Sequence, residues 1–296
     1  MGYGSYSYDA HQALTRSRQG LSADAVFTQT VMHPAMDPKG VRFRESRDSE
    51  AHPDSLGIVF ALDISGSMAQ IPVSIACEQL PGFMKLLEDC RVADPQVLFM
   101  AFTDLQGDGR PLQVGQFETT AELMDQWLTR CSLKGGGNEL YELAMHFAAH
   151  HTAMDCWERR QKKGYFFITG DEPTSETLSA AVVERFLGTS IQDQPLEAVV
   201  EDLKKTYEPF FLIPDRSRGS RIADFWRRYL GDRTIVLESP DDTCGAAAGL
   251  VALGEGTVSD LSELQARLVA AGTSKARAGA IAGALKPWAE SSERGR

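Results

Sequence analysis

The chain has 296 residues, which is long enough for one large α/β domain with extensions or for two small domains. Hydrophobic residues make up 43% of it and charged residues 24%, as is ordinary for a soluble globular protein. The formal net charge of -11 argues against general binding to nucleic acid or to an anionic membrane surface, because both would be repelled.

The five cysteines are scattered and form no CxxC pair, which favours neither a disulfide framework nor a cysteine zinc site. The first 20 residues hold no apolar segment, so the sequence predicts neither a signal peptide nor a transmembrane helix there. We therefore expect a cytoplasmic protein.

Residues 1–54 are polar and are broken by three X-Pro pairs, at Pro34, Pro38 and Pro53. We interpret them as an N-terminal extension without a core of its own. Two alternatives remain open at this point: the extension is a flexible arm, or residues 41–43 add a strand or clasp to the domain.

The first strong strand signal is the apolar run 58–62, whose length and β-branched content are typical of a strand buried on both faces. After it we expect a helix over 71–90 that is interrupted or restarted at Pro81. Further strands are predicted over 96–103 and, as a short edge strand, over 112–117. Helices over 121–131 and 139–154 then flank a glycine loop at 134–137.

Three more strands are predicted in the second half, over 164–169, 207–213 and 234–237, with helices over 220–230 and 244–253. This alternation predicts an α/β fold with a doubly wound, mostly parallel sheet flanked by helices over residues 55–254. Residues 174–205 exceed an ordinary connection, so we expect an insertion there. Residues 255–296 are predicted to form a C-terminal helical extension.

Polar residues follow the first buried strand directly, as Asp63, Ser65 and Ser67. Ligands of open α/β sheets bind beyond the carboxyl ends of the strands, which is where these residues fall. Carboxylate and hydroxyl oxygens are hard ligands that suit Mg²⁺ or Mn²⁺ better than zinc. The pattern therefore indicates a site for a divalent cation.

The segment DISGS resembles the DxSxS motif of von Willebrand factor type A (vWA) domains, and the chain is similar to bacterial or phage intracellular members of that family. Such domains carry a metal-ion-dependent adhesion site (MIDAS) built from three loops, and the resemblance implies bound Mg²⁺, or Mn²⁺ or Ca²⁺. It places Asn138, after KGGG, where many members have a threonine. In the third loop, FITGDEP, it assigns the aspartate ligand to Asp171.

Several of these residues have other interpretations. Asn138 is expected either to bind the metal or to cap a helix that begins at Glu139. Glu142 is a second-shell candidate that would point back at the site, although an exposed glutamate on a helix is usually just solvated. Asp104 ends the strand VLFMAFTD and is predicted to hold a second-shell water, whereas Asp108 more simply forms a turn.

The resemblance implies a function in binding rather than catalysis. Few of the ligands carry formal charge, so the ion keeps positive charge and an open position that a partner's Asp or Glu can fill. We thus expect a protein interaction module, an adaptor whose partner would be an ATPase, a kinase or a phosphatase. The alternative is a metal-dependent hydrolase or phosphotransferase on the same fold, which would need a general base that no motif supplies.

Two further clusters have simple interpretations. His146 and His150 have metal-ligand spacing on a predicted helix, but they lack the glutamate of an HExxH site and are better interpreted as packed or solvated. A basic concentration between residues 216 and 228 is interpreted as a solvated helix face, with an acidic partner or RNA as the alternative. It consists of Arg216, Arg218, Arg221, Arg227 and Arg228.

Overall fold

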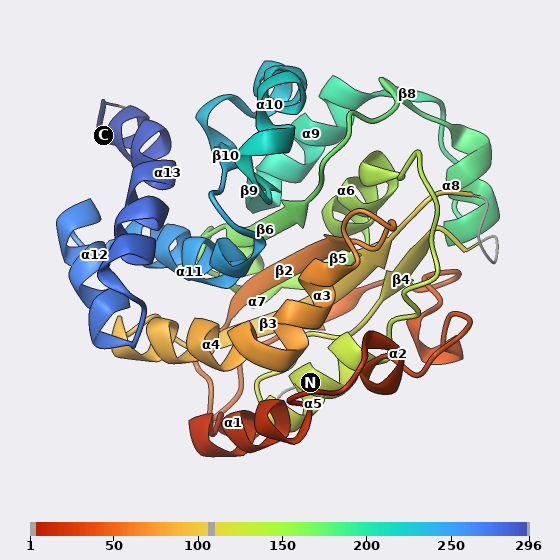
Figure 1. Ribbon diagram of the computed structural model, residues 1–296. Coiled ribbons are helices and arrows are strands. Elements are labelled where there is room, and N and C mark those ends of the chain that lie inside the picture. The colour runs from red at the N-terminus through yellow and green to blue at the C-terminus, as the bar shows by residue number, and fades with distance from the viewer. Residues whose placement is uncertain (1–3, 106–109, 295–296) are drawn as a thin grey trace.

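A computed structural model of the protein describes residues 4–105 and 110–294, leaving aside the side chains of residues 220, 221, 293 and 294. Within these residues, a six-stranded sheet has the order β10-β9-β6-β2-β3-β4 (Figure 1). All its neighbouring strands are parallel except β4, which is antiparallel to β3. The strands are β2 (Leu56–Asp63), β3 (Pro95–Phe102), β4 (Leu112–Val114), β6 (Gly164–Thr169), β9 (Tyr207–Ile213) and β10 (Thr234–Val236).

The sheet confirms the predicted doubly wound α/β fold. Strand β2 lies between β3 and β6, and all eight of its residues are buried. Phe60 of this strand packs against Phe99 of β3 and Phe167 of β6, with ring centroids 5.8 and 5.4 Å apart. A continuous apolar run is what a strand with both faces covered requires.

Helices cover both faces of the sheet. On one face lie α3 (Gln70–Ser74), α4 (Leu80–Asp89) and α11 (Thr243–Gly254), of which α4 and α11 pack side by side (Figure 1). On the opposite face, α6 (Tyr141–His150) packs against α9 (Leu196–Thr206), and α10 (Arg216–Leu230) connects β9 to β10. The chain passes from β2 through α3 and α4 to β3 on one side of β2, and later crosses to β6, β9 and β10 on the other side, so crossovers of one hand place helices on opposite faces.

The predicted interruption of the first helix is a π-helical turn, Ile75–Gln79, between α3 and α4. It falls just before Pro81, whose missing N–H cannot complete a regular α-helical ladder.

The described part of the N-terminal segment packs on the domain. It contains α1 (Tyr8–Ser17), α2 (Ala23–Val26), a 3₁₀ turn (Pro34–Met36) and β1 (Arg44–Ser46). Helix α1 contacts α4 and α5 (Ala121–Thr129), while Phe27 and Met36 are buried in the common core. The strand expected over 41–43 is found three residues later as β1.

Strand β1 pairs in parallel with β5 (Thr152–Met154). The helix predicted over 139–154 is shorter at both ends: α6 begins at Tyr141 and ends at His150, where the chain enters β5. A short helix, α7 (Asp155–Glu158), follows β5.

The segment predicted as an insertion contains a small antiparallel pair, β7 (Thr177–Leu178) with β8 (Gln194–Pro195), around α8 (Ala180–Leu187). Its second helical pattern is α9, the crossover helix that leads into β9.

After 3₁₀ turns at Gly231–Arg233 and Pro240–Asp242, the chain ends in α12 (Leu261–Ala270) and α13 (Lys275–Arg294). Both helices contact α11 (Figure 1). Trp288 of α13 meets Phe210 of β9 edge to face. None of the helices in the described ranges has the length and apolar character needed to cross a membrane.

Candidate metal site

Asp63 is the last residue of β2 and is fully buried at the carboxyl edge of the sheet. Its Oδ1 accepts a hydrogen bond from the backbone N–H of Ser65 (2.8 Å), and its Oδ2 accepts one from the hydroxyl of Tyr141 (2.7 Å). Burial raises the pKa of Asp63 to about 6, although both hydrogen bonds oppose the rise; the charge of Asp171 adds to it.

The two serines of the motif present their hydroxyls together. Ser65 Oγ and Ser67 Oγ are 3.3 Å apart, with Ser65 buried and Ser67 exposed. The turn closes when the N–H of Met68 donates to the carbonyl of Ser65 (2.9 Å). A cation beside Asp63 could therefore meet hydroxyl oxygens on its solvent side.

The glycine loop lies directly on the end of β3. A Cβ at Gly136 would be 2.6 Å from Asp104 Oδ2, and one at Gly135 would be 2.2 Å from Thr103 Oγ1, so only glycine allows this approach. The N–H of Gly136 donates to Thr103 Oγ1 (3.2 Å). Asp104 is 2% exposed, and neither of its carboxyl oxygens has a hydrogen-bond partner in the described part of the chain.

Asn138 does not cap the following helix. Helix α6 begins at Tyr141 with Leu140 at the N-cap position and without a side-chain capping bond, so the capping interpretation is wrong. Asn138 has a φ of 72°, in the left-handed region that asparagine tolerates, and its side chain is exposed. Its role as a metal ligand stays a prediction.

Glu139 and Tyr141 were not identified from the sequence. Glu139 is 2% exposed, and its pKa is raised by burial and then by the charge of Asp63. Burial also raises the pKa of Tyr141 well above its ordinary value, and Asp63 adds to the rise. The acidic residue after the glycine loop was a signal for Glu139, whereas Tyr141 carried none, because a tyrosine on a helix usually packs in the core.

In the third loop, Asp171 is paired with an arginine. Arg218 Nη1 donates to Asp171 Oδ2 (2.6 Å) and to the carbonyl oxygen of Ser67 (3.1 Å), while Arg218 Nε lies 3.1 Å from Asp215 Oδ2. Arg218 therefore joins the first and third loops, a role that the interpretation of a solvated basic face missed. Asp171 Oδ1 is buried without a hydrogen-bond partner among the described residues. The side chain of Arg221 lies outside the described residues, as does Asp108.

Glu142 is buried rather than solvated, at 2% exposed. Its Oε2 accepts a hydrogen bond from Thr174 Oγ1, and burial raises its pKa to about 7. This bond ties α6 to the segment that follows the third loop.

The oxygen atoms at this edge fit a hard divalent cation. The buried carboxyl oxygens of Asp104 and the Oδ1 of Asp171 have no protein partner in the described ranges, and Asp63 keeps further lone pairs. Carboxylate and hydroxyl oxygens in this mixture suit Mg²⁺, Mn²⁺ or Ca²⁺. The predicted residues Asp63, Ser65, Ser67 and Asp171 are brought together here, and Asp104 lies beneath the glycine loop.

His, Cys, Asp and Glu side chains alone do not make a metal site in the described part of the chain, at the edge of β2 or elsewhere. The described residues contain no group of three or more of these types that could hold a metal ion. The rings of His146 and His150 are 4.5 Å apart, and His150 lies 3.2 Å from Asp202.

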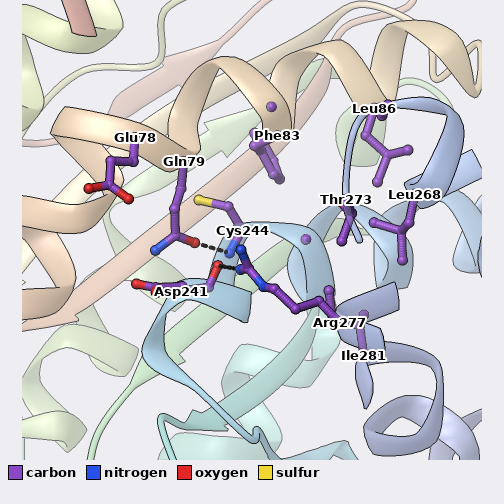
Figure 2. Close-up of a pocket in the computed structure, with 13 residues that line it drawn as sticks. Glu78, Gln79, Phe83, Leu86, Asp241, Cys244, Leu268, Thr273, Arg277 and Ile281 are labelled. Carbon is purple, nitrogen blue, oxygen red and sulfur yellow. Dashed lines mark hydrogen bonds between the residues drawn. The ribbon is translucent and has the colours of Figure 1, made fainter. Parts of the chain in front are cut away.

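A cavity of about 270 Å³ lies apart from the candidate site, between α4, α11 and the α12–α13 pair (Figure 2). The side chain of Gln79 accepts a hydrogen bond from the N–H of Cys244, and Arg277 donates to the carbonyl of Asp241, as Figure 2 shows. None of the candidate ligands lines it.

Comparison of the sequence with models of protein families gives no match, and comparison with curated proteins gives none. Proximal thread matrix protein 1 (PTMP1) from the mussel byssus is 13% identical, with a TM-score of 0.42 over 74% of this chain and 47% of that one. A PTMP1 structure with a zinc-occupied MIDAS motif is 12% identical, with a TM-score of 0.40 and coverage of 70% and 50%. The pilus adhesin SpaC from Lactobacillus rhamnosus GG is 13% identical, with a TM-score of 0.42 and coverage of 75% and 32%. The chain thus spans half or less of the length of these proteins.

Proposed function

We propose that this chain is a vWA-type interaction module that binds a divalent cation at the carboxyl edge of its sheet and docks a carboxylate of a protein partner on that ion. The observation that carries the proposal is the convergence of Asp63, Ser65 and Ser67 with Asp171 at one edge, next to buried carboxyl oxygens that lack a hydrogen-bond partner among the described residues.

The geometry explains how docking would work. Asp63 is held rigidly by Tyr141 and by the turn of Ser65, so it is oriented before an ion arrives. Ser67 and the guanidinium of Arg218 lie on the outer side of the site, where both are accessible. A carboxylate from a partner would approach from that side, gain a bond to the metal and be attracted by the arginine.

The finer parts of the proposal rest on the sequence. The DISGS motif supports a bacterial or phage intracellular vWA domain, and hard oxygen ligands support Mg²⁺ as the ion. Cysteines without disulfide partners support a cytoplasmic location. The partner would present Asp or Glu, and an ATPase, kinase or phosphatase served by an adaptor is the proposed class.

Calorimetric titration of chelator-treated protein with Mg²⁺ and Mn²⁺ tests the ion. We expect saturable binding to the wild type and none to Asp63→Asn, which keeps the shape of the side chain and removes its charge. Equal binding by the two proteins would overturn the proposal.

Docking is tested separately, by fluorescence anisotropy with a labelled peptide library in which each Asp or Glu peptide has an Asn or Gln counterpart. We expect acidic peptides to bind the wild-type protein in the presence of Mn²⁺ and to be released by EDTA. They should not bind the Asp63→Asn protein. Hydrolysis of a phosphate ester that depends on Asp63 would instead favour the enzymatic alternative.

A further inference from the structure

The backbone of the third loop is held by a buried indole. Trp226 of α10 is fully buried, and its Nε1–H donates a hydrogen bond to the carbonyl oxygen of Glu172 (3.0 Å). Glu172 follows Asp171 directly in the chain. Because Nε1 is the one polar atom of an indole, this bond orients the ring and fixes the backbone next to Asp171 at the same time.

The same ring belongs to an aromatic cluster that reaches the first loop. Trp226 stacks on Phe211 of β9, with ring centroids 4.2 Å apart and an angle of 22° between the planes. It also packs on Tyr141 of α6, with 5.4 Å between the centroids. The hydroxyl of Tyr141 donates to Asp63 Oδ2 (2.7 Å). A continuous set of contacts therefore connects the backbone of the third loop to the carboxylate of the first.

Gly170 shows how closely the third loop approaches this cluster. A Cβ at Gly170 would lie 2.3 Å from a ring carbon of Tyr141 and 2.7 Å from a ring carbon of Phe211. The N–H of Gly170 also donates to the carbonyl of Leu212 (3.2 Å), which continues the pairing with β9. No side chain fits between the loop and the rings, so a change in the rings is transmitted to the backbone of the loop.

Helix α10 holds the third loop at two points. Arg218 donates to the carboxylate of Asp171 (2.6 Å), and about two turns further along the helix Trp226 contacts the carbonyl of the next residue. The side chain of Arg218 is 28% exposed, whereas Trp226 is fully buried. Because partly exposed ion pairs are weak and screened by salt, the buried indole is the stronger constraint on the loop.

We propose that Trp226 is a positioning residue of the candidate ion site, which sets the place of Asp171 relative to Asp63. This inference rests on the proposed function, because it concerns the same ion. The indole acts through two neighbours, the carbonyl of Glu172 on one side and the ring of Tyr141 on the other. Groups that orient the ligands of a hard cation raise affinity because the oxygens need not be rearranged when the ion binds.

The first test is calorimetric titration of Trp226→Phe with Mn²⁺. This change removes the N–H and keeps an aromatic ring in the cluster. We expect affinity for Mn²⁺ to fall by about three- to tenfold, because the indole acts on the backbone beside a ligand and not on the ligand itself.

Trp288→Phe is the matched control. Trp288 is also a buried tryptophan that packs on a phenylalanine of β9, but its Nε1 has no hydrogen-bond partner among the described residues. We expect Trp288→Phe to bind Mn²⁺ within about twofold of the wild type, because it lies away from the candidate ligands. Thermal melting of both variants in EDTA establishes that each is folded at the temperature of the titration.

A spectroscopic readout needs no change at Trp226. The chain has four tryptophans, so labelling with 5-fluorotryptophan gives four ¹⁹F resonances, which phenylalanine variants of the other three assign by elimination. We expect the resonance of Trp226 to shift on titration with Mg²⁺, because its hydrogen-bond acceptor is next to a ligand, and that of Trp288 to stay. A tryptophan that only fills the core would not respond to the ion. This measurement also decides the matter if Trp226→Phe does not fold.

The outcomes separate the two proposals. Wild-type affinity in Trp226→Phe, or an equal loss in Trp288→Phe, would overturn the positioning role and leave the ion site in place if Asp63→Asn still abolished binding. A Trp226 resonance that does not move at saturating Mg²⁺ would overturn the role as well. Absence of ion binding by the wild type would overturn both proposals.

Discussion

Asp63 shows how much one buried carboxylate depends on its neighbours. Its two oxygens are held by Ser65 and Tyr141, and its environment raises its pKa to about 6. The hydroxyl of Tyr141 comes from α6, more than 70 positions along the chain, so the orientation of the first motif residue depends on a helix that follows the second loop.

At the residue scale, Tyr141→Phe tests this dependence. It leaves Asp63 Oδ2 without its donor, and we expect the free energy of unfolding to fall by about 1.5–3 kcal/mol at pH 8 in EDTA, the range for hydrogen bonds to charged groups. The control is Tyr207→Phe, because Tyr207 is equally buried but its hydroxyl meets the neutral hydroxyl of Thr152. Tyr207→Phe should lower the free energy of unfolding, measured by urea denaturation, by only about 0.5–1.5 kcal/mol. Equal losses would contradict a special role of the carboxylate.

Arg218→Gln is a second change at this scale. The guanidinium neutralises Asp171 and so competes with a metal ion for it, but the pair is partly exposed and therefore worth only about 1 kcal/mol. We expect Mn²⁺ affinity to rise by about two- to fivefold. Calorimetry would contradict this if affinity fell, which would mean that the arginine mainly holds the loops in place.

At the element scale, the N-terminal helix α1 carries a buried histidine that makes its packing sensitive to pH. His11 is fully buried on α1, and its Nδ1 lies 3.0 Å from the hydroxyl of Tyr6. Burial lowers its pKa to about 4; Arg18 lowers it as well, while Asp125 and Glu122 oppose the shift.

The sign of the pH dependence follows from the lowered pKa. The unfolded chain takes up a proton on His11 near pH 6.5 and the folded chain only near pH 4, so stability is complete above pH 6.5 and is lost as the pH falls toward 4. A shift of this size corresponds to about 3 kcal/mol. His11→Gln should therefore have a shallower fall of unfolding free energy between pH 6.5 and 4 than the wild type. If the free energy of unfolding fell equally with pH in both proteins, His11 would not be buried in solution, and α1 would not stay packed on the domain.

Two helical glycines give a matched pair of predictions. Gly82 of α4 has open space where a Cβ would lie, whereas a Cβ at Gly249 of α11 would be 2.8 Å from Leu264 of α12. Gly82→Ala is expected to raise the free energy of unfolding by about 0.5–1 kcal/mol through helix propensity. Gly249→Ala is expected to lower it by about 1–3 kcal/mol, because α11 and α12 would be forced apart. Denaturant titrations measure the free energy of unfolding of both variants. Changes of the same sign would contradict the difference in packing between Gly82 and Gly249.

At the scale of the whole molecule, the C-terminal helices share the core of the sheet. Trp288 of α13 is 8% exposed and packs edge to face on Phe210 of β9, while Leu285 and Ile281 of the same helix are also buried. The terminal helices are therefore expected to unfold together with the sheet rather than before it.

Trp288→Ala tests this expectation. We expect the free energy of unfolding to fall by about 3–5 kcal/mol, with transitions by far-ultraviolet circular dichroism and by fluorescence remaining coincident. A small loss, or two separate transitions, would mean that residues 255–296 behave as an independent unit.

The fold could be predicted from local pattern because buried strands and amphipathic helices alternate along the chain. The run that became β2 is apolar throughout, as a central parallel strand must be. The ends of the parallel strands agree with the prediction to within two residues, whereas the edge strand predicted over 112–117 is shorter and ends at Val114. The pairing of β1 with β5 joins segments about 100 residues apart, and α6 ends where the chain enters β5, earlier than its sequence pattern suggested.

For the candidate site, the sequence by itself determined that Asp63, Ser65 and Ser67 stand at the end of a buried strand, because strand, turn and motif are contiguous. Only the tertiary structure decided that Glu139 turns inward and that Arg218 reaches the third loop. The direction of a side chain in a loop depends on backbone angles and on contacts with distant elements. Neither follows from the periodic pattern of apolar residues, which is the signal that predicts helices and strands from sequence.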